Sequence, residues 1–478
     1  MSIYPDTDLL VGGQWRSGGA GVLDVVNPAT EEVIGKLAKA GRQDLDDALQ
    51  AVAAGFDAWR RTSAYERAAL MRKAADLLAA RVEEIAPVLT MEQGKPLQQA
   101  RNEVNSAVEV IRWFAEEAMR AYGRIIPARA PDVVQNVIKE PVGPVAAFTP
   151  WNFPINQAVL KISAALAAGC SIIVKGPEET PASCAALVKA FADAGLPDGS
   201  INLLYGVPSE ISSYLIASPI IRKVSFTGST AVGKLLAEQA GKYMKRITLE
   251  LGGHAPVLVF DDADVEGAAK VMARLKFYNS GQICIAPTRF MVQEKAYDNF
   301  VADFENQVSK LKLGNGLEAD VTMGPLANDR RLSAMAELTE DAVKHGGKLL
   351  TGGERVGNRG NFFAPTILLE TDPAAKIQND EPFGPVALVS RFRTAEEAIS
   401  EANRLPFGLA AYAFTRSAKT MNDLSDHVET GMLSINHAGL ALPETPFGGV
   451  KDSGYGMEGG AEGIEAYLQP KFVTRKLF

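Results

Sequence analysis

Apolar residues recur at helical spacing over the first part of the chain. Within residues 44–86, for example, Ala48, Val52 and Phe56 fall on one face of a helix. The same spacing continues over residues 97–121. Both segments are therefore predicted to be helical.

The pattern changes character between residues 123 and 144. Ile125, Val133 and Val137 are β-type residues, and prolines interrupt the segment. We expect extended strands there rather than a continuation of the helices.

Short apolar runs alternate with helical stretches from residue 145 to residue 253. The runs are strand candidates and cover residues 145–148, 172–174, 201–205, 223–226 and 247–251. Helices are expected between them, at residues 155–168 and 181–194. Strands that alternate with helices indicate a parallel α/β sheet. A similar alternation resumes over residues 255–460, so the whole chain is predicted to be of the α/β class.

Composition narrows the class of protein. A chain of 478 residues is long enough for roughly three domains of about 150 residues. The net charge of −8 argues against a nucleic-acid partner, which requires clustered Lys and Arg. Three cysteines without metal-type spacing indicate a reduced setting and no metal site. Residues 1–8 lack signal-peptide features, and no apolar run approaches the ~20 residues of a membrane span, so we expect a cytoplasmic protein.

Two segments that follow predicted strands carry groups suited to a dinucleotide. Gly228 and Ser229 open a helix that Ser229 or Thr230 can cap, and the free N–H groups of a helix start favour a pyrophosphate. The Gly-x-x-x-x-Gly spacing differs from the usual fingerprint, so an ordinary strand–helix turn is the alternative. Lys175 and Glu178 could reach an adenosine ribose, where a carboxylate favours NAD over NADP. A solvated loop is the alternative there.

A lone cysteine at a polar break in the pattern is a candidate nucleophile. Cys284 follows the polar residues 279–282, where a side chain can face a cleft. A free thiol has a pKa of about 8.5, and the thiolate is the nucleophile. Cys170 and Cys184 lie at apolar positions and are expected to be buried and inert.

A carboxylate and an amide complete the set of candidate groups. Glu250 stands between two leucines at a strand end, where burial would raise its pKa toward that of a working general base. A salt-bridged structural glutamate is the alternative. Asn152, between Trp151 and Phe153, could donate to an oxyanion, although turn-forming asparagines are common. A thiol, a carboxylate and an amide suffice for covalent oxidation of an aldehyde.

The chain resembles the NAD(P)-dependent aldehyde dehydrogenase superfamily over essentially its whole length. Segments that match the family motifs, in order, are residues 150–154, 175–181, 226–233, 250–256, 281–284, 381–385 and 446–449. The resemblance implies a Rossmann-type NAD-binding domain, an α/β catalytic domain and a small β bridging arm. The implied bounds are residues 1–122 and 145–252, residues 253–460, and residues 123–144 and 461–478, respectively.

The resemblance also implies roles for particular residues. Cys284 would be the nucleophile, Glu250 the general base that activates water, and Asn152 the oxyanion donor together with the Cys284 backbone N–H. Residues implied to contact NAD are Trp151, Lys175, Glu178, Gly228, Ser229, Glu381 and Phe383. Hydride would pass from the Cys284 adduct to the nicotinamide, leaving a thioester that water hydrolyses. Glu250 argues against transfer to coenzyme A, and the intact trio argues against a non-catalytic binding or structural member of the fold.

The expected substrate pocket departs from the most similar subgroup, the bacterial succinate-semialdehyde and 2-oxoglutarate-semialdehyde dehydrogenases. Succinate-semialdehyde enzymes hold a distal carboxylate with two arginines and a serine, and the corresponding positions here are Leu160, Tyr278 and Ala441. With Phe153 and Phe447, these residues are expected to form the pocket. A carboxylate buried there would lack a partner, so the pocket favours an apolar, aromatic or neutral hydroxylated aldehyde. Overall similarity favours a semialdehyde.

Two segments resemble the family's bridging elements. The strands expected over residues 123–144 and the tail over residues 469–478 would join subunits, with the tail paired to a partner. An exposed β arm would otherwise be a costly free edge. A homodimer or homotetramer is expected.

Overall fold

The apolar runs of the first half pair as a parallel sheet in the computed structural model, which describes residues 4–477. Such runs can be apolar on both faces because helices cover both faces of a parallel sheet. The parallel strands are β7 (Val145–Phe148), β8 (Ile172–Lys175), β9 (Ile201–Leu204), β10 (Lys223–Thr227) and β11 (Arg246–Glu250). They lie in the order β9-β8-β7-β10-β11, so the order reverses between β7 and β10. Open α/β sheets bind ligands at the carboxyl ends of the strands at such a switch point.

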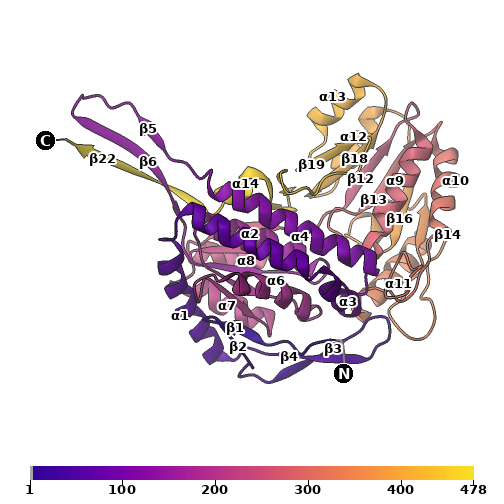
Figure 1. Ribbon diagram of the computed structural model, residues 1–478. Coiled ribbons are helices and arrows are strands. Elements are labelled where there is room, and N and C mark those ends of the chain that lie inside the picture. The colour runs from indigo at the N-terminus through magenta and orange to yellow at the C-terminus, as the bar shows by residue number, and fades with distance from the viewer. Residues whose placement is uncertain (1–3, 478) are drawn as a thin grey trace.

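Helices pack around this sheet (Figure 1). α5 and α6 contact its strands from one side and are covered in turn by α2, α3 and α4, while α1, α7 and α8 form a second group against it. Their bounds are α1 (Arg42–Trp59), α2 (Ala64–Ala80), α3 (Val82–Gln93), α4 (Leu97–Ala118), α5 (Pro154–Ala168), α6 (Pro181–Ala194), α7 (Pro208–Ala217) and α8 (Thr230–Lys242). The predicted helices are therefore present, with the first helical segment extended through α3.

The pattern of apolar and polar residues did not predict the short N-terminal strands. They are β1 (Leu9–Val11), β2 (Gln14–Arg16), β3 (Val22–Val26) and β4 (Val33–Ala38). β1 and β2 extend the first sheet at its β9 edge, whereas β3 and β4 pair with each other. Most of β3 is exposed, so its residues show no alternation of apolar and polar positions.

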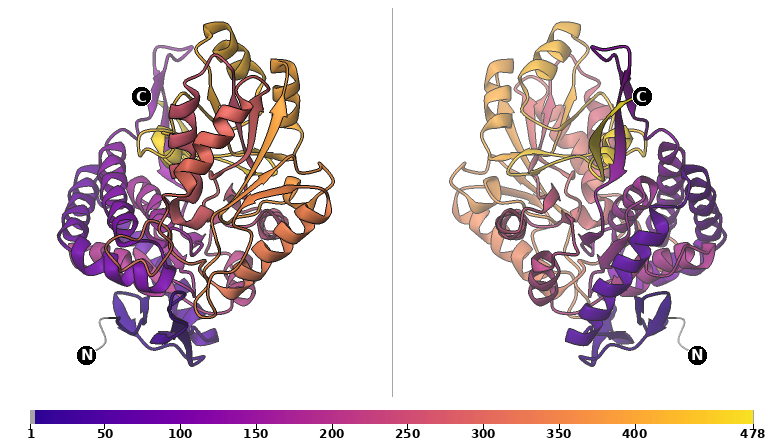
Figure 2. Two further views of the ribbon diagram at one scale, coloured as in Figure 1. Left: turned by 90° about the vertical axis from the view of Figure 1, so that its right-hand side faces the viewer. Right: turned by 90° about the vertical axis from the view of Figure 1, so that its left-hand side faces the viewer.

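The second half forms another α/β lobe, seen from two further sides in Figure 2. Its sheet has the order β14-β15-β16-β13-β12-β18-β19 and is parallel except at β14. The strands are β12 (Ala255–Val259), β13 (Pro287–Gln293), β14 (Lys348–Thr351), β15 (Thr366–Leu369), β16 (Val386–Phe392), β18 (Ala410–Phe414) and β19 (Met432–Ile435). Its helices are α9 (Val265–Phe277), α10 (Tyr297–Val308), α11 (Asp329–Lys344), α12 (Ala395–Asn403) and α13 (Ala418–His427).

The chain returns to the first lobe after β19. β20 (Val450–Lys451) pairs with β17 (Phe407–Gly408), and β21 (Gly454–Tyr455) then pairs with β11 at the edge of the first sheet. The two lobes are thus joined by backbone hydrogen bonds next to the carboxyl end of β11.

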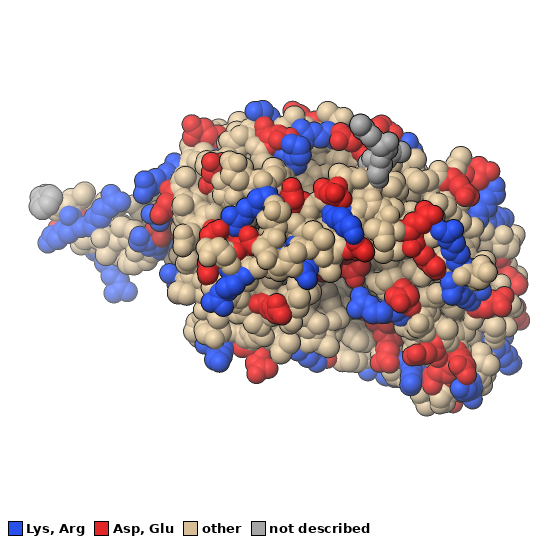
Figure 3. All heavy atoms as spheres, turned by 90° about the horizontal axis from the view of Figure 1, so that it is seen from below, with Lys and Arg blue, Asp and Glu red and all other residues tan. Residues whose placement is uncertain are grey.

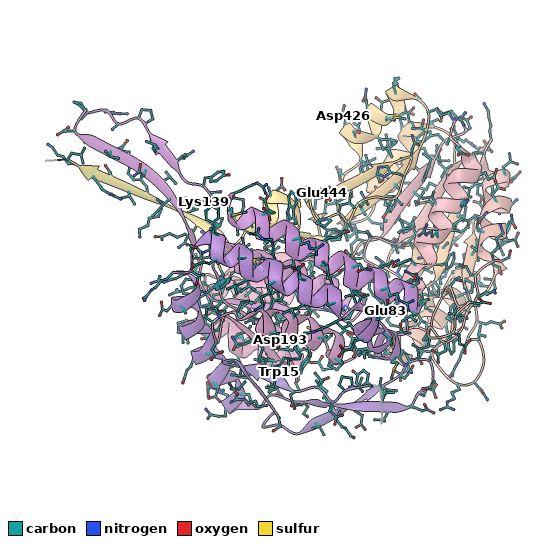
Figure 4. The ribbon with its side chains drawn as sticks, in the orientation of Figure 1. Trp15, Glu83, Lys139, Asp193, Asp426 and Glu444 are labelled. Atoms are coloured by element: carbon teal, nitrogen blue, oxygen red, sulfur yellow. The ribbon has the colours of Figure 1, made fainter. Side chains whose placement is uncertain are left out.

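A β arm projects from the first lobe (Figure 1). It consists of β5 (Arg124–Ile126), β6 (Val133–Pro141) and β22 (Leu468–Lys476), in the order β22-β6-β5. β22 pairs antiparallel with β6 along its whole length. At the base of the arm, Lys139 (labelled in Figure 4) forms an ion pair with Glu465 of α14 (Gly460–Glu465). The strands expected over residues 123–144 are confirmed, and the tail pairs within its own chain.

The charged side chains are distributed rather than segregated. On the face shown in Figure 3, acidic and basic residues are interspersed over the body of the molecule, whereas Lys and Arg predominate on the part that projects on the left. None of the helices formed by residues 4–477 combines the length and apolar character that crossing a membrane requires.

Candidate active site

Strand ends of the first sheet bring three predicted site segments together. β7 leads into the loop that carries Asn152, β10 leads into Gly228, and β11 ends at Glu250. Because β7, β10 and β11 are neighbours in the sheet, these segments emerge side by side at its carboxyl edge. Cys284 comes from the second lobe, in the loop after α9.

The loop before Cys284 has an unusual backbone. Asn279, Ser280 and Gly281 have φ values of 49°, 55° and 72°, which is the left-handed region. A Cβ on Gly281 would lie 2.2 Å from the carbonyl oxygen of Gly384, so only glycine fits there. Strain of this kind persists where the surroundings over-determine the conformation, and such sites are often functional.

Buried polar side chains hold this loop in place. Gln282 is fully buried; its Nε2 donates to the carbonyl oxygen of Asn279 (3.1 Å), and its Oε1 accepts from Ala327 N (3.0 Å). Ser280 Oγ donates to the carbonyl oxygen of Gly324 (2.8 Å). The polar residues before Cys284 are therefore internal supports, and Cys284 itself borders the cavities, as the sequence suggested.

Cys284 lies where an apolar cavity meets a polar one. The apolar cavity has a volume of about 210 Å³ and is lined by Ser106, Val110, Phe153, Asn156, Gln157, Leu160, Leu275, Tyr278, Ile283, Cys284, Ile285, Ala441, Leu442, Pro443, Phe447 and Gly459. The polar cavity, of about 530 Å³, is lined by Pro150, Trp151, Asn152, Gln157, Thr227, Gly228, Ser229, Glu250, Leu251, Gly252, Cys284, Asn328, Arg330, Arg331, Glu381 and Phe383. A thiol at this junction can meet reactants that enter from either side.

The thiol is protonated in this environment. Burial raises the pKa of the Cys284 thiol, and together with the nearby carboxylates of Glu381 and Glu250 it brings the pKa to about 12, because negative charge disfavours the thiolate. The backbone N–H groups of Cys284 and Ile285 act in the opposite direction. Loss of the proton therefore requires an acceptor or a change in nearby charge. Cys170 and Cys184 are fully buried, as expected.

Glu250 is buried at the end of β11 with 2% of its surface exposed. Within the part of the chain that the structure describes, neither of its carboxylate oxygens has a hydrogen-bond partner. Burial raises its pKa well above the ordinary value, Glu458 raises it further, and Lys161 lowers it. Lys161 instead contacts Glu458 (2.5 Å) and Thr227 Oγ1 (2.7 Å). The alternative of a salt-bridged structural glutamate is therefore wrong, and the carboxylate is free to act on a ligand.

Asn152 is fixed beside the Cys284 loop. Its Nδ2 donates to the carbonyl oxygen of Gln282 (3.0 Å), and its own carbonyl oxygen accepts from Lys95 Nζ (2.8 Å) and Asn279 Nδ2 (3.0 Å). An amide nitrogen carries two hydrogens, so one remains available for an oxyanion. Lys95, in the loop between α3 and α4, is a supporting residue that sequence reasoning missed, because a lysine in a loop normally indicates a solvated surface.

The residues expected at the nicotinamide end line the polar cavity. Glu381 accepts from Gly253 N (3.2 Å), and burial raises its pKa to about 7. A Cβ on Gly252 would lie 2.4 Å from Glu381 Oε2, so a larger residue there would displace this carboxylate. The Trp151 and Phe383 rings meet edge to face with centroids 5.6 Å apart. This end of the cavity offers a carboxylate for hydroxyl groups and an aromatic wall for a planar ring.

The phosphate and adenosine ends also have suitable groups. Gly228 and Ser229 line the same cavity at the N-terminus of α8, whose first N–H groups favour an anion. Ser229 occupies the N-cap position, but its side chain makes no capping hydrogen bond within the described residues, so the predicted side-chain cap is wrong and its hydroxyl is available. Lys175 is buried and contacts Glu178 at 2.5 Å, and Glu178 borders a further cavity. A dinucleotide fits this set of groups.

The apolar cavity contains all five of the expected pocket residues, Phe153, Leu160, Tyr278, Ala441 and Phe447. The Phe153 and Tyr278 rings are parallel to within 3°, with centroids 6.5 Å apart. Leu442 and Pro443 contribute from the loop that continues to the exposed Glu444 (labelled in Figure 4). Among residues 4–477, those that line this cavity include no Lys or Arg. Its chemistry suits a neutral, apolar group.

Comparisons with known proteins agree with this geometry. The model of the "Aldehyde dehydrogenase family" matches residues 15–473. The chain is 48% identical to 4-(hydroxymethyl)benzenesulfonate dehydrogenase TsaD1 of Comamonas testosteroni, with 98% of each chain covered. It is 42% identical to succinate semialdehyde dehydrogenase of Acinetobacter baylyi, covering 97% of this chain and 96% of the relative. The solved structure of succinate-semialdehyde dehydrogenase from Burkholderia pseudomallei superposes with a TM-score of 0.97 at 40% identity, covering 100% of this chain and 99% of the other.

Proposed function

The chain belongs to the aldehyde dehydrogenase family and is an NAD(P)-dependent aldehyde dehydrogenase, and from this premise we propose that Cys284 is its nucleophile, Glu250 its general base and Asn152 its oxyanion donor. The observation that carries this assignment is the position of the Cys284 thiol at the junction of an apolar and a polar cavity, with Glu250 and Asn152 beside it. The substrate enters the apolar cavity, and the dinucleotide occupies the polar one.

The first step joins Cys284 to the substrate. The Cys284 thiol first loses its proton to solvent. The thiolate sulfur then adds to the aldehyde carbon, and the carbonyl oxygen becomes an oxyanion near the free Asn152 N–H and the Cys284 backbone N–H. When NAD(P)⁺ is bound in the polar cavity, it accepts the hydride from this carbon. The product left on Cys284 is a thioester.

The second step releases the acid. Glu250 takes a proton from water as the water oxygen attacks the thioester carbon, and the carbon–sulfur bond then breaks to return the Cys284 thiolate. A carboxylate with two unpartnered oxygens and a raised pKa suits a base that works near neutral pH. The base also favours water over coenzyme A as the acceptor.

Trapping the thioester tests these assignments. In a Glu250→Gln variant given benzaldehyde and NAD, we expect a rapid burst of NADH, slow turnover, and an acyl adduct on Cys284 in mass spectra. The matched Cys284→Ser variant should form no adduct. An enzyme that forms no adduct and no NADH with any aldehyde in a panel would instead support the non-catalytic alternative, and product formed only with coenzyme A would support an acyl-transferring enzyme.

The proposed substrate is an apolar or aromatic aldehyde. The relative from Comamonas testosteroni is named for an aromatic sulfonate, 4-(hydroxymethyl)benzenesulfonate, whereas other relatives are named for semialdehydes. The apolar cavity supports the aromatic choice, because a short dicarboxylic semialdehyde would place its carboxylate near Leu160 and Ala441 without a cation. A much higher kcat/KM for succinate semialdehyde than for benzaldehyde or hexanal would contradict this proposal.

The proposed cofactor preference is NAD over NADP. Glu178 lies at the carboxyl end of β8, accepts from Gly206 N (3.3 Å) and pairs with Lys175. A carboxylate there can accept from the 2′-hydroxyl of NAD and repels a 2′-phosphate. The wild-type enzyme should show at least about tenfold higher kcat/KM with NAD, and a Glu178→Ser variant should narrow this ratio. Equal efficiency of the wild type with both cofactors would contradict the proposal.

A further inference from the structure

One polar side chain at the junction of the two cavities has no role in the proposed mechanism. Gln157, on α5, borders both the apolar and the polar cavity, as Cys284 does. Its surface is only 8% exposed. Any substrate that places its aldehyde carbon on the Cys284 sulfur therefore brings the neighbouring atoms past the Gln157 amide.

The Gln157 amide has one end enclosed and one end available. Its Oε1 is buried, and no donor among the described residues reaches it. Because the side chain borders both cavities, the Nε2 group is the polar atom left to face the junction. An enclosed amide oxygen without a donor destabilises the fold, and an apolar side chain of equal size would avoid this cost. A contact with a ligand gives the residue a function that an apolar side chain could not supply.

The neighbouring amide nitrogens of Asn152 and Asn156 each use one N–H in a hydrogen bond, whereas among the described residues Gln157 Nε2 uses none. Asn152 Nδ2 donates to the carbonyl oxygen of Gln282 (3.0 Å), and Asn156 Nδ2 donates to Ser106 Oγ (3.4 Å). Asn156 lines the apolar cavity but not the polar one. Gln157 therefore offers a neutral donor beside the reacting carbon, while the rest of the substrate meets apolar walls.

We propose that Gln157 is a specificity-determining residue that donates a hydrogen bond to an oxygen substituent close to the aldehyde carbon. The proposal rests on the proposed function, because Cys284 sets the position of that carbon. The substrate class is an aromatic aldehyde with an ortho oxygen, of which 2-hydroxybenzaldehyde is the simplest probe. In that molecule the hydroxyl hydrogen bonds internally to the aldehyde oxygen, so a lone pair on the phenol oxygen remains to accept from Gln157.

A matched pair of substrates isolates this hydrogen bond. A hydroxyl and a methyl group are similar in size, but only the hydroxyl oxygen accepts from an amide. For the wild-type enzyme, kcat/KM should be about tenfold higher with 2-hydroxybenzaldehyde than with 2-methylbenzaldehyde, as expected for one hydrogen bond. Gln157→Met and Gln157→Leu should each bring this ratio close to 1. Asn156→Leu, a change at the adjacent amide, should keep the ratio of the wild type.

Each result has a distinct meaning. A wild-type ratio near 1, or a ratio that both Gln157 variants retain, overturns the role of Gln157 and leaves the dehydrogenase proposal standing. The loss of the ratio in Asn156→Leu as well as in the Gln157 variants also overturns it, because the effect would then not be specific to the junction. Absence of NADH with every aldehyde tested contradicts the proposed function itself.

Discussion

At the scale of single residues, the proposed chemistry depends on the protonation of two buried groups, the Cys284 thiol and the Glu250 carboxyl group. Burial and neighbouring carboxylates raise the pKa of Cys284 to about 12, and burial with Glu458 raises that of Glu250 well above its ordinary value. Both groups act after losing a proton. Raised pKa values therefore shift their working forms to higher pH.

We accordingly expect kcat/KM to rise with pH from about pH 6 to about pH 9, since the deprotonated fraction of a group below its pKa grows tenfold per pH unit. A pH–rate profile with benzaldehyde and saturating NAD measures this. The Glu250→Gln variant should lose the contribution of the carboxylate to hydrolysis, while its burst phase still follows the Cys284 thiol. A profile that is flat over this range, or that falls, is inconsistent with the roles assigned to these residues.

At the scale of elements, a buried ion pair joins α4 to the start of α5. Lys95 Nζ lies 2.5 Å from Glu103 Oε2, and both side chains are fully buried. Glu103 Oε1 accepts from the backbone N–H groups of Ile155 (2.9 Å) and Asn156 (3.2 Å), while Lys95 also donates to the Asn152 carbonyl oxygen. The pair thereby holds the Asn152 loop and satisfies the free N–H groups at the helix start.

Removing one partner of this pair leaves a buried, unpaired charge. Glu103→Ala should lower the free energy of unfolding by about 3–5 kcal/mol and reduce activity through displacement of Asn152. Chemical denaturation and kcat/KM measure the two effects. The control is Arg101→Ala on the same helix, which removes an exposed pair with Glu83 (labelled in Figure 4) and should change little. Equal effects of the two variants would show that burial does not determine how much an ion pair contributes to stability and activity.

At the scale of the whole molecule, the arm exposes a sheet edge. β22 is an outer strand whose other edge has no neighbour within residues 4–477, and Phe472 and Ile125 in the arm are 55% and 82% exposed. Free edges and apolar surface of this kind favour pairing with another chain. We propose that the arm formed by β5, β6 and β22 joins subunits, through the outer edge of β22 rather than by exchange of the tail.

Light scattering tests the proposed assembly. The full chain should have the mass of a dimer or tetramer. A chain that ends at Leu468 should form an assembly of fewer subunits, because it lacks the outer strand. Phe472→Asp should also weaken assembly. Lys471→Ala, which removes an ion pair with Glu140 (3.0 Å), serves as the control and should not alter the mass. A monomeric full-length chain would exclude the proposal.

The local pattern of apolar and polar residues was sufficient to predict the class of fold and most elements of the first sheet. Strand periods, helix periods and breaking residues are properties of neighbouring positions, so β7–β11 and α5–α6 could be located from them. The exceptions, such as β2 and β3, are short strands with exposed faces, in which no apolar alternation marks the strand.

The candidate trio was also accessible from the sequence, because Glu250 and Asn152 each stand between apolar residues and Cys284 follows a polar loop. Sequence reasoning could further state which side chains a substrate pocket would lack, since Leu160 and Ala441 are apolar in any environment. The resemblance to the family identified these positions as pocket positions, and their apolar character follows from the residues themselves.

Only the tertiary structure decided where charge and polarity are buried. Whether Gln282, Lys95 or Lys161 is solvated or internal depends on which distant element covers it, and pKa shifts follow from that burial. The meeting of two cavities at Cys284 likewise requires both lobes, because one cavity is lined largely by strand ends of the first sheet. Residue types could therefore indicate the reaction, whereas the state of the thiol and the presence of Gln157 beside it depend on packing between segments far apart in the chain.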